Sequence, residues 1–301
     1  MTEARASRFG IPALVLASLF WGTTGTAASL LPDNVSPVAI GASTFAIGGL
    51  LLFAFSARAS IAALRDPRSR RWLALGAVGV VIYPLAFYFA MDEAGVAIGN
   101  VVALGSGPIF AALLEWVGEH RRPSLRWALC AGVAIVGVVL LSTGRAAGEG
   151  KNIALGVALG LTAGLAYALY TYASTRALAL EHSGRGVMGG MFGLGAVVLA
   201  PVLIATGAPL LERAQSVGVA AYLAIGPMFI AYLLFGFGLR SIQSSVATTV
   251  TLIEPVVAAA LAVLVVGERL APSGWAGLAL ILLGVAALVT ARLPGKPSTA
   301  A

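Results

Sequence analysis

The chain has 301 residues, of which 59% are hydrophobic and only 10% are charged. Ordinary soluble domains contain roughly 25% charged residues, so this composition excludes a soluble protein and indicates one with many membrane-spanning helices. The net charge of +7 could suggest nucleic-acid binding, but the basic residues are scattered through short segments between apolar runs. We therefore expect no nucleic-acid partner and interpret these residues as markers of topology.

Ten long apolar runs follow one another along the chain. Each is close to the roughly 20 residues that a helix needs to cross the hydrocarbon layer. The first run follows Arg5 and Arg8 as a signal peptide would, but it continues to Leu31, which is too long for a signal sequence. The sequence therefore predicts an all-α membrane protein with ten transmembrane helices, at 9–31, 37–57, 72–91, 96–114, 127–143, 153–175, 187–206, 217–239, 244–266 and 273–291.

The basic residues indicate how these helices are oriented. If both termini lie in the cytoplasm, fifteen of the 19 lysines and arginines fall on that side, and Arg145, Lys151, Arg213 and Arg269 fall on the other. Cytoplasmic loops carry an excess of lysine and arginine. We therefore expect both termini to be cytoplasmic.

The chain also repeats itself with a period of nearly 150 residues. Gly107-Pro108 opens an apolar run that ends in Gly118-Glu119, and Glu254-Pro255 opens one that ends in Gly267-Glu268. Split at a connecting loop, 144–152, the halves 1–143 and 153–301 have five spans each. An odd number of spans gives the second half the opposite orientation, and two inverted halves can hold a substrate site between them.

Pro108 and Pro255 occupy matching places in the fourth and ninth spans. A proline inside a helix removes one backbone hydrogen bond and tends to kink the helix. The paired kinks are interpreted either as bends in a cavity wall or as hinges for opening and closing.

Glu254 is the acidic residue closest to the middle of a span, while Gly107 stands at the matching place in the first half. A carboxyl group at this depth must be neutralised, paired or hydrated, and such residues are often functional. Three interpretations stay open for Glu254: a neutral structural glutamate, a carrier of protons, or a binding group for a substrate amine.

Several amphipathic side chains also lie at mid-depth. They predict a central cavity with apolar walls and hydrogen-bonding groups, although core packing alone explains each ring separately. The cavity residues that we single out, besides Glu254, are Trp21, Tyr83, Asn100, Ser106, Tyr167, Tyr232, Ser244 and Thr248. With no cluster of charges, we expect a small cargo that is neutral or zwitterionic and partly apolar.

Enzymatic chemistry has little support in the sequence. His120 and His182 lie in loops, and the chain has a single cysteine, no metal-binding histidine motif and no phosphate-binding loop. We expect a protein that is not an enzyme, without a metal or cofactor; a membrane enzyme or a scaffold is the alternative from another class.

The second half carries the most specific motif. Glu254-Pro255-Val256, followed by Gly267-Glu268-Arg269-Leu270 and a glycine-containing last helix, resembles the EamA repeat of the drug/metabolite transporter superfamily. Trp21-Gly22 and the Pro108 to Glu119 run resemble the first copy, in which Gly107 replaces the acid.

The resemblance implies ten helices in two inverted five-helix repeats around a central cavity, and secondary transport. It is closest to bacterial exporters of aromatic and other amino acids. It thus implies a multi-pass inner-membrane protein that exports amino acids by alternating access, as a monomer; efflux of drugs, nucleosides or other metabolites is the alternative.

Overall fold

The computed structural model describes residues 3–94, 96–143, 152–266 and 270–290. Every regular element in these ranges is helical. The first part of the chain forms α1 (Glu3–Gly22), α2 (Thr24–Ala28), α3 (Pro37–Phe55), α4 (Ala57–Arg65), α5 (Pro67–Ala94), α6 (Val96–Glu119) and α7 (Leu125–Thr143). The second part forms α8 (Ile153–Leu178), α9 (Gly184–Thr206), η1 (Ala208–Leu211), α10 (Ala214–Leu223), η2 (Ala224–Ile230), α11 (Ala231–Gly238), α12 (Ser244–Val250), η3 (Thr251–Ile253), α13 (Glu254–Leu261), η4 (Ala262–Val266) and α14 (Pro272–Thr290).

Nine of the described helical segments are long and apolar enough to cross a membrane. The remaining expected span, 127–143, corresponds to α7, whose apolar part Leu125–Leu141 is shorter than the other nine. The chain is therefore an all-helical, multi-pass membrane protein, and the exact number of ten stays a prediction. Of the proposed connecting loop, residues 144–151 lie outside the described residues, as does the Gly267-Glu268 motif.

Three of the expected spans are not uniform helices, and the first is divided at Thr23 between α1 and α2. The eighth contains a π-helical segment, η2, which includes Pro227, between α10 and α11. The ninth passes through the short 3₁₀ segment η3 immediately before Glu254 and Pro255, and through the π-helical η4 after α13. Proline removes a hydrogen bond from the helical ladder, which accounts for the irregular turns at η2 and η3, whereas η4 contains no proline. By contrast, α6 continues through Pro108 as one element.

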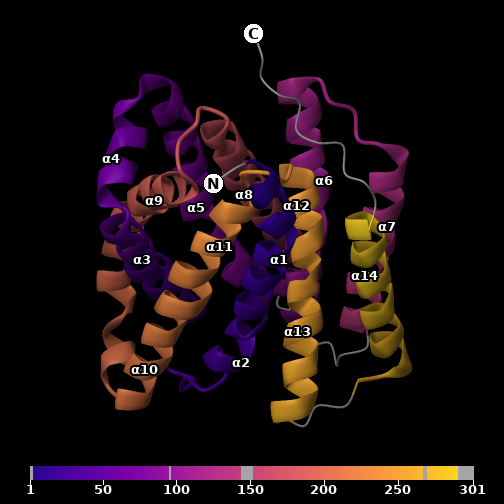
Figure 1. Cartoon of the computed structure of the whole chain (residues 1–301). Helices are drawn as coiled ribbons and strands as arrows, with labels where there is room; N and C mark the ends of the chain where they lie inside the picture. The colour runs from indigo at the N-terminus through magenta and orange to yellow at the C-terminus, as the bar shows by residue number, and fades with distance from the viewer. Residues whose placement is uncertain (1–2, 95, 144–151, 267–269, 291–301) are drawn as a thin grey trace.

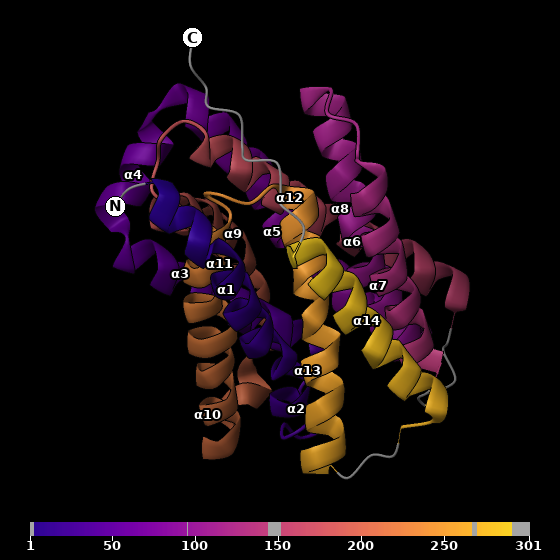
Figure 2. The same cartoon turned by 45° about the vertical axis from the view of Figure 1, so that its right-hand side comes forward.

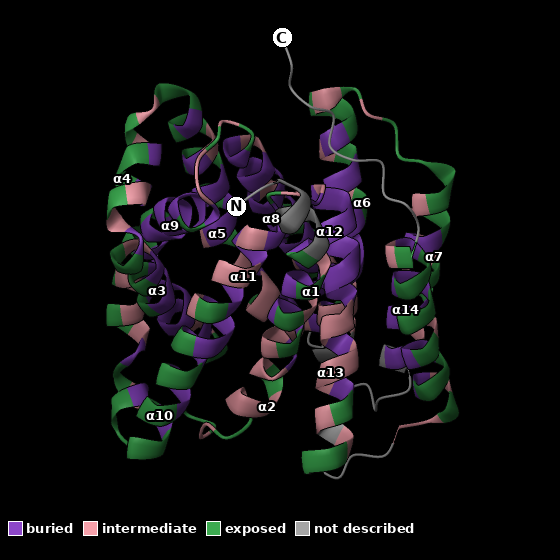
Figure 3. Ribbon diagram, in the orientation of Figure 1, coloured by how far each residue is buried: buried purple, intermediate pink, exposed green. Residues whose placement is uncertain are grey.

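The helices pack in pairs through small residues. α5 lies against α8 and α9 against α3, while α7 and α14 form a pair at the side of the bundle (Figures 1 and 2). In that pair, a Cβ atom at Gly137 would lie 2.7 Å from the carbonyl oxygen of Gly277. Because the hydrophobic effect between helices is small in lipid, such close backbone approach supplies much of the packing energy. Buried residues concentrate on the inward faces of the helices (Figure 3).

We call the end of the bundle at which α1 begins the basic end. It holds the C-terminal ends of α6 and α8 and the N-terminal ends of α5, α9 and α12, and it lies at the top of Figure 1. Arginines 58, 65, 68, 70, 71, 121, 122, 126, 176, 185 and 240 lie there in or between these elements. We call the other end, with α2 and the C-terminal end of α5, the distal end.

Candidate functional site

A chamber with a volume of about 690 Å³ lies between the helices. Its wall includes Tyr167 and Tyr232 in the interior of the bundle, and it reaches Ala28, Pro37 and Asp92 at the distal end. A volume of this size is typical of sites for small molecules. The chamber therefore approaches the surface at the distal end.

Aromatic rings form much of the chamber wall. The indole nitrogen Nε1 of Trp21 donates to the carbonyl oxygen of Pro227 at 2.8 Å, and its ring lies 5.1 Å from that of Tyr232, centroid to centroid. Tyr83 lies 5.9 Å from Tyr167 and 6.0 Å from Tyr170 in the same way. Ring pairs at these separations attract each other beyond their burial of apolar area. The rings thus hold one another in place around the cavity.

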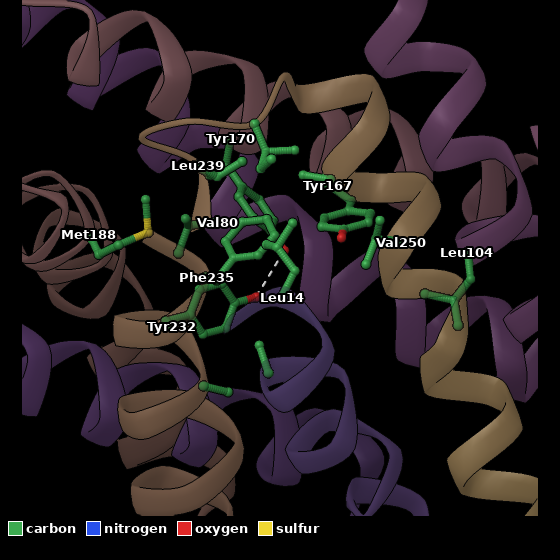
Figure 4. Close-up of a cluster of buried hydrophobic side chains, with 14 of the residues drawn as sticks. Leu14, Val80, Leu104, Tyr167, Tyr170, Met188, Tyr232, Phe235, Leu239 and Val250 are labelled. Atoms are coloured by element: carbon green, nitrogen blue, oxygen red, sulfur yellow. Dashed lines mark hydrogen bonds between the residues drawn. The ribbon is translucent and has the colours of Figure 1, made fainter. Parts of the chain in front are cut away.

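Two hydrogen bonds between side chains fix the tyrosine hydroxyls. The Tyr167 hydroxyl pairs with Thr251 Oγ1 at 2.6 Å. The Tyr170 hydroxyl pairs with that of Tyr232 at 2.8 Å, and this second bond is drawn as a dashed line in Figure 4. These bonds join α8 to η3 and to α11. A buried hydroxyl without a partner is costly, so the two pairs stabilise this part of the core.

Glu254 lies in the chamber wall at the start of α13, with its side chain half-buried. In the described part of the chain, no group donates a hydrogen bond to its carboxyl group, and no lysine, arginine or histidine lines the chamber. A second carboxyl group, that of Asp92, lies toward the distal end. The charged side chains of the described wall are therefore both acidic.

Glycines explain how the helices around Glu254 come close. A Cβ atom at Gly22 would lie 2.9 Å from the Glu254 carbonyl oxygen, so α1 approaches α13 only with glycine there. A Cβ atom at Gly107 would lie 2.9 Å from Cδ1 of Tyr167. The ring of Tyr167 therefore occupies the place beside Gly107 where a side chain would stand, and the repeat is asymmetric here for a steric reason.

Six of the nine cavity residues expected from the sequence line the chamber: Trp21, Tyr83, Asn100, Tyr167, Tyr232 and Glu254. Ser106, Ser244 and Thr248 are not part of its wall. Ser106 is buried against Gly164 where α6 meets α8, and the Thr248 hydroxyl donates to backbone carbonyl oxygens of its own helix. Of the two prolines expected to act as hinges, Pro255 lines the chamber and Pro108 does not.

Glu115, a buried acid near the C-terminal end of α6, is not among the site residues predicted from the sequence. The Ser244 hydroxyl donates to its Oε1 at 2.6 Å, and the backbone N–H of Ser245 donates to the same oxygen at 2.9 Å. The Ser245 hydroxyl donates to Oε2 at 2.5 Å. One carboxylate thus joins α6 to the start of α12 at the basic end. We call this group of three residues the Glu115 cluster.

Ion pairs add to the contacts at the basic end. Glu119 Oε1 lies 3.3 Å from Arg176 Nη1, and the Arg176 guanidinium lies 5.4 Å from the ring centroid of Trp72. These contacts connect the ends of α5, α6 and α8. Farther along the same end, Asp66 Oδ2 lies 3.1 Å from His182 Nε2. The backbone N–H of Arg68, and after it His182, hold the pKa of Asp66 below its usual value.

The described residues contain no group of three or more histidines, cysteines and acids that could hold a metal ion. Together, the helical bundle and its chamber define a polytopic membrane protein with an internal site for a small molecule.

Comparison with known proteins identifies the family. Residues 8–143 and 154–290 each match the EamA-like transporter family, so the chain belongs to that family and contains its repeat twice. The uncharacterized transporter YwfM of Bacillus subtilis (strain 168) is 33% identical over 294 residues, 95% of each chain. An uncharacterized transporter of Archaeoglobus fulgidus is 26% identical over 285 residues, which cover 95% of this chain and 98% of that protein.

One solved crystal structure has the same fold. Its TM-score is 0.76 over 96% of this chain and 97% of that chain, at 23% sequence identity. The protein is thus a membrane transporter of the EamA-like family.

Proposed function

We propose that this transporter exports neutral amino acids, the aromatic ones among them, across the inner membrane by alternating access. The observation that carries the proposal is the chamber, whose walls combine aromatic rings with hydrogen-bonding groups such as Asn100 and the carboxyl group of Glu254. Aromatic amino acids have an apolar ring and a small polar end, which match the two kinds of wall. Transport of this kind needs no bound cofactor, and we propose no enzymatic activity.

In this proposal the basic end faces the cytoplasm, together with both termini, because arginine is concentrated there and cytoplasmic loops carry an excess of basic residues. The chamber of this structure then approaches the outside. The two halves, 1–143 and 153–301 with the connecting loop 144–152, are inverted copies. In support, α1 begins at the basic end, whereas α8 begins at the distal end. Asn152, the residue before α8, donates its backbone N–H to the carbonyl oxygen of Glu93, near the C-terminal end of α5, at 2.9 Å.

To load cargo from the cytoplasm, the basic end must open. The Glu115 cluster joins α6 to α12 at that end, so its hydrogen bonds break when the two helices separate. Pro108 in α6 and Pro255 in α13, which follows α12 in the same expected span, are the proposed hinges for this movement, since each proline lacks the N–H for one hydrogen bond of the helical ladder. The proposed unit is a monomer, because the chamber lies within one chain.

Efflux of drugs, nucleosides or other metabolites is the second candidate. It is favoured by the apolar part of the chamber wall, where Phe45, Phe87 and Met228 offer no hydrogen bond to an amino acid.

Counterflow in proteoliposomes tests the proposal. Vesicles loaded with an unlabelled amino acid and diluted into a trace of the labelled one are expected to accumulate label transiently and saturably. Tryptophan, phenylalanine, leucine and glutamate form the panel, and glutamate is expected to be the poorest. Trp21→Ala, which removes a ring from the chamber wall, is expected to lower the flux, and Trp275→Ala, on the exposed face of α14, serves as control. No flux of any amino acid with folded wild-type protein would refute the proposal.

A further inference from the structure

We infer that the cargo is bound through a protonated amine that pairs with Glu254, so that the chamber selects amines and excludes organic anions. The inference rests on the proposed function, because it assigns the way in which the same chamber recognises its cargo. It starts from one feature: Glu254 is an acid in a chamber wall whose described residues offer no positive partner.

A carboxylate away from bulk water is stable only when it is paired, hydrogen-bonded or neutralised. Elsewhere in this chain that rule is met: the buried carboxylate of Glu115 accepts three hydrogen bonds from two serines. Among the described residues, none donates to Glu254, although its side chain lies at the chamber. The partner that Glu254 lacks is therefore expected to arrive from the chamber itself, as a proton or as a cation.

The surrounding rings favour an organic cation. The faces of tryptophan and tyrosine carry partial negative charge and attract ammonium groups within about 6 Å of the ring centre. Trp21, Tyr83 and Tyr232 line the same chamber as Glu254. An acid among aromatic rings is suited to an amine with an apolar body.

An anion meets the opposite situation. The described wall of the chamber holds the acid Glu254 and no lysine, arginine or histidine. Like charges at short distance in a partly dry cavity repel strongly. The amide of Asn100 is a neutral donor in the wall and suits the carboxylate of a zwitterion. The amine of the cargo is thus required, whereas its carboxylate is tolerated.

A matched series of four indole compounds tests this inference on the full chain in nanodiscs. Tryptamine carries only the amine, tryptophan carries the amine and the carboxylate, tryptophanamide carries the amine with a neutral amide, and indole-3-propionate carries only the carboxylate. The measurement is the dissociation constant by calorimetry at neutral pH. Tryptamine and tryptophanamide are expected to bind at least as tightly as tryptophan, and indole-3-propionate at least tenfold more weakly.

Three variants assign the selectivity to Glu254. Glu254→Gln keeps the shape and removes the charge, so we expect the amines to lose at least tenfold in affinity and the difference from indole-3-propionate to shrink. Glu254→Asp keeps the charge and is expected to keep the preference. Glu181→Gln, on an exposed residue at the basic end, is the control and is expected to match the wild type. Thermal unfolding establishes that each variant is folded.

Equal binding of indole-3-propionate and tryptamine would overturn the inference, as would an unchanged preference in Glu254→Gln or binding of none of the four compounds to folded protein. These outcomes are distinct from failure of the proposed function. If amino acids show counterflow but the anion binds as well as the amine, export stands and the role of Glu254 falls. If no amino acid is transported but the amines bind selectively through Glu254, the inference stands and the cargo is another amine.

Discussion

The Glu115 cluster gives the sharpest test of how the basic end stays closed. In Glu115→Ala the hydroxyl groups of Ser244 and Ser245 and the backbone N–H of Ser245 lose their acceptor. Hydrogen bonds to a charged group contribute about 1.5–3 kcal/mol each. Because the three bonds share one carboxylate and lie near the end of the bundle, we take about 3 kcal/mol for the group, less than their sum.

If these bonds exist only while the basic end is closed, their loss shifts the equilibrium toward the open state by the same amount. About 3 kcal/mol corresponds to a factor of roughly 150 in the equilibrium constant. Glu115→Gln keeps one acceptor oxygen, so its effect is expected to be smaller. Neither variant is expected to alter the chamber wall, of which Glu115 is not a part.

Thiol accessibility measures this shift. Thr248, fully buried one turn deeper in the bundle than Ser244, is replaced by cysteine in a Cys130→Ala background. The rate of reaction with a membrane-impermeant maleimide supplied at the basic end is then compared among variants. We expect the rate to rise about 100-fold with Glu115→Ala and to stay constant with Glu181→Gln. An unchanged rate in folded Glu115→Ala protein would refute the role assigned to the cluster, as would an equal rise in the control.

Two further predictions concern packing and pH. Gly22→Ala places a Cβ atom 2.9 Å from the Glu254 carbonyl oxygen and close to Val257, so this variant is expected to lower the melting temperature and counterflow. The control is Gly25→Ala, whose Cβ atom meets no atom within 4 Å. It is expected to leave the melting temperature unchanged. If both behave alike, the close approach of α1 and α13 is not what glycine provides. For Asp66, the folded-state pKa lies below the usual 3.8, so its stabilising contribution is present above that pH and is lost as the pH falls through the folded-state pKa. The difference in melting temperature between wild type and Asp66→Asn is therefore expected to be larger at pH 5 than at pH 3, and a difference that grows toward pH 3 would contradict this reasoning.

The sequence alone predicts much of the fold because long apolar runs have few structural solutions in a membrane. Runs such as 37–57 and 187–206 correspond closely to α3 and α9, and the match of two segments to one family agrees with the duplication read from Gly107-Pro108 and Glu254-Pro255. The interruptions η2 and η4 were not predicted. Hydrophobicity reports the length of a span, whereas a π-turn depends on local hydrogen bonding.

The chamber residues could be predicted only in part, because a helix that is apolar on all sides gives no signal for which face points inward. Trp21, Tyr167 and Tyr232 stand out by chemical type, and all three line the chamber. Ser244 and Thr248 are equally polar, but their hydroxyls bond to Glu115 and to the backbone.

Hydrophobicity does not indicate Glu115 as a site residue, because its charge ends the apolar run at residue 114. Its signal lies in the spacing: Ala103, Gly107, Ala111 and Glu115 follow at four-residue steps and therefore share one face of α6. The first three leave space for neighbouring helices, and an acid that continues such a face is expected to contact a neighbour as well.

Reversible closure of the basic end tests the central claim most directly. Glu115 and Ser245, whose side chains are in contact, are both replaced by cysteine in the Cys130→Ala background and bridged with a short, reducible bifunctional thiol reagent. Tryptophan counterflow is measured before bridging, after bridging and after reduction. Alternating access through this end predicts that flux stops when the residues are bridged and returns after reduction. Undiminished flux through bridged protein would contradict the account.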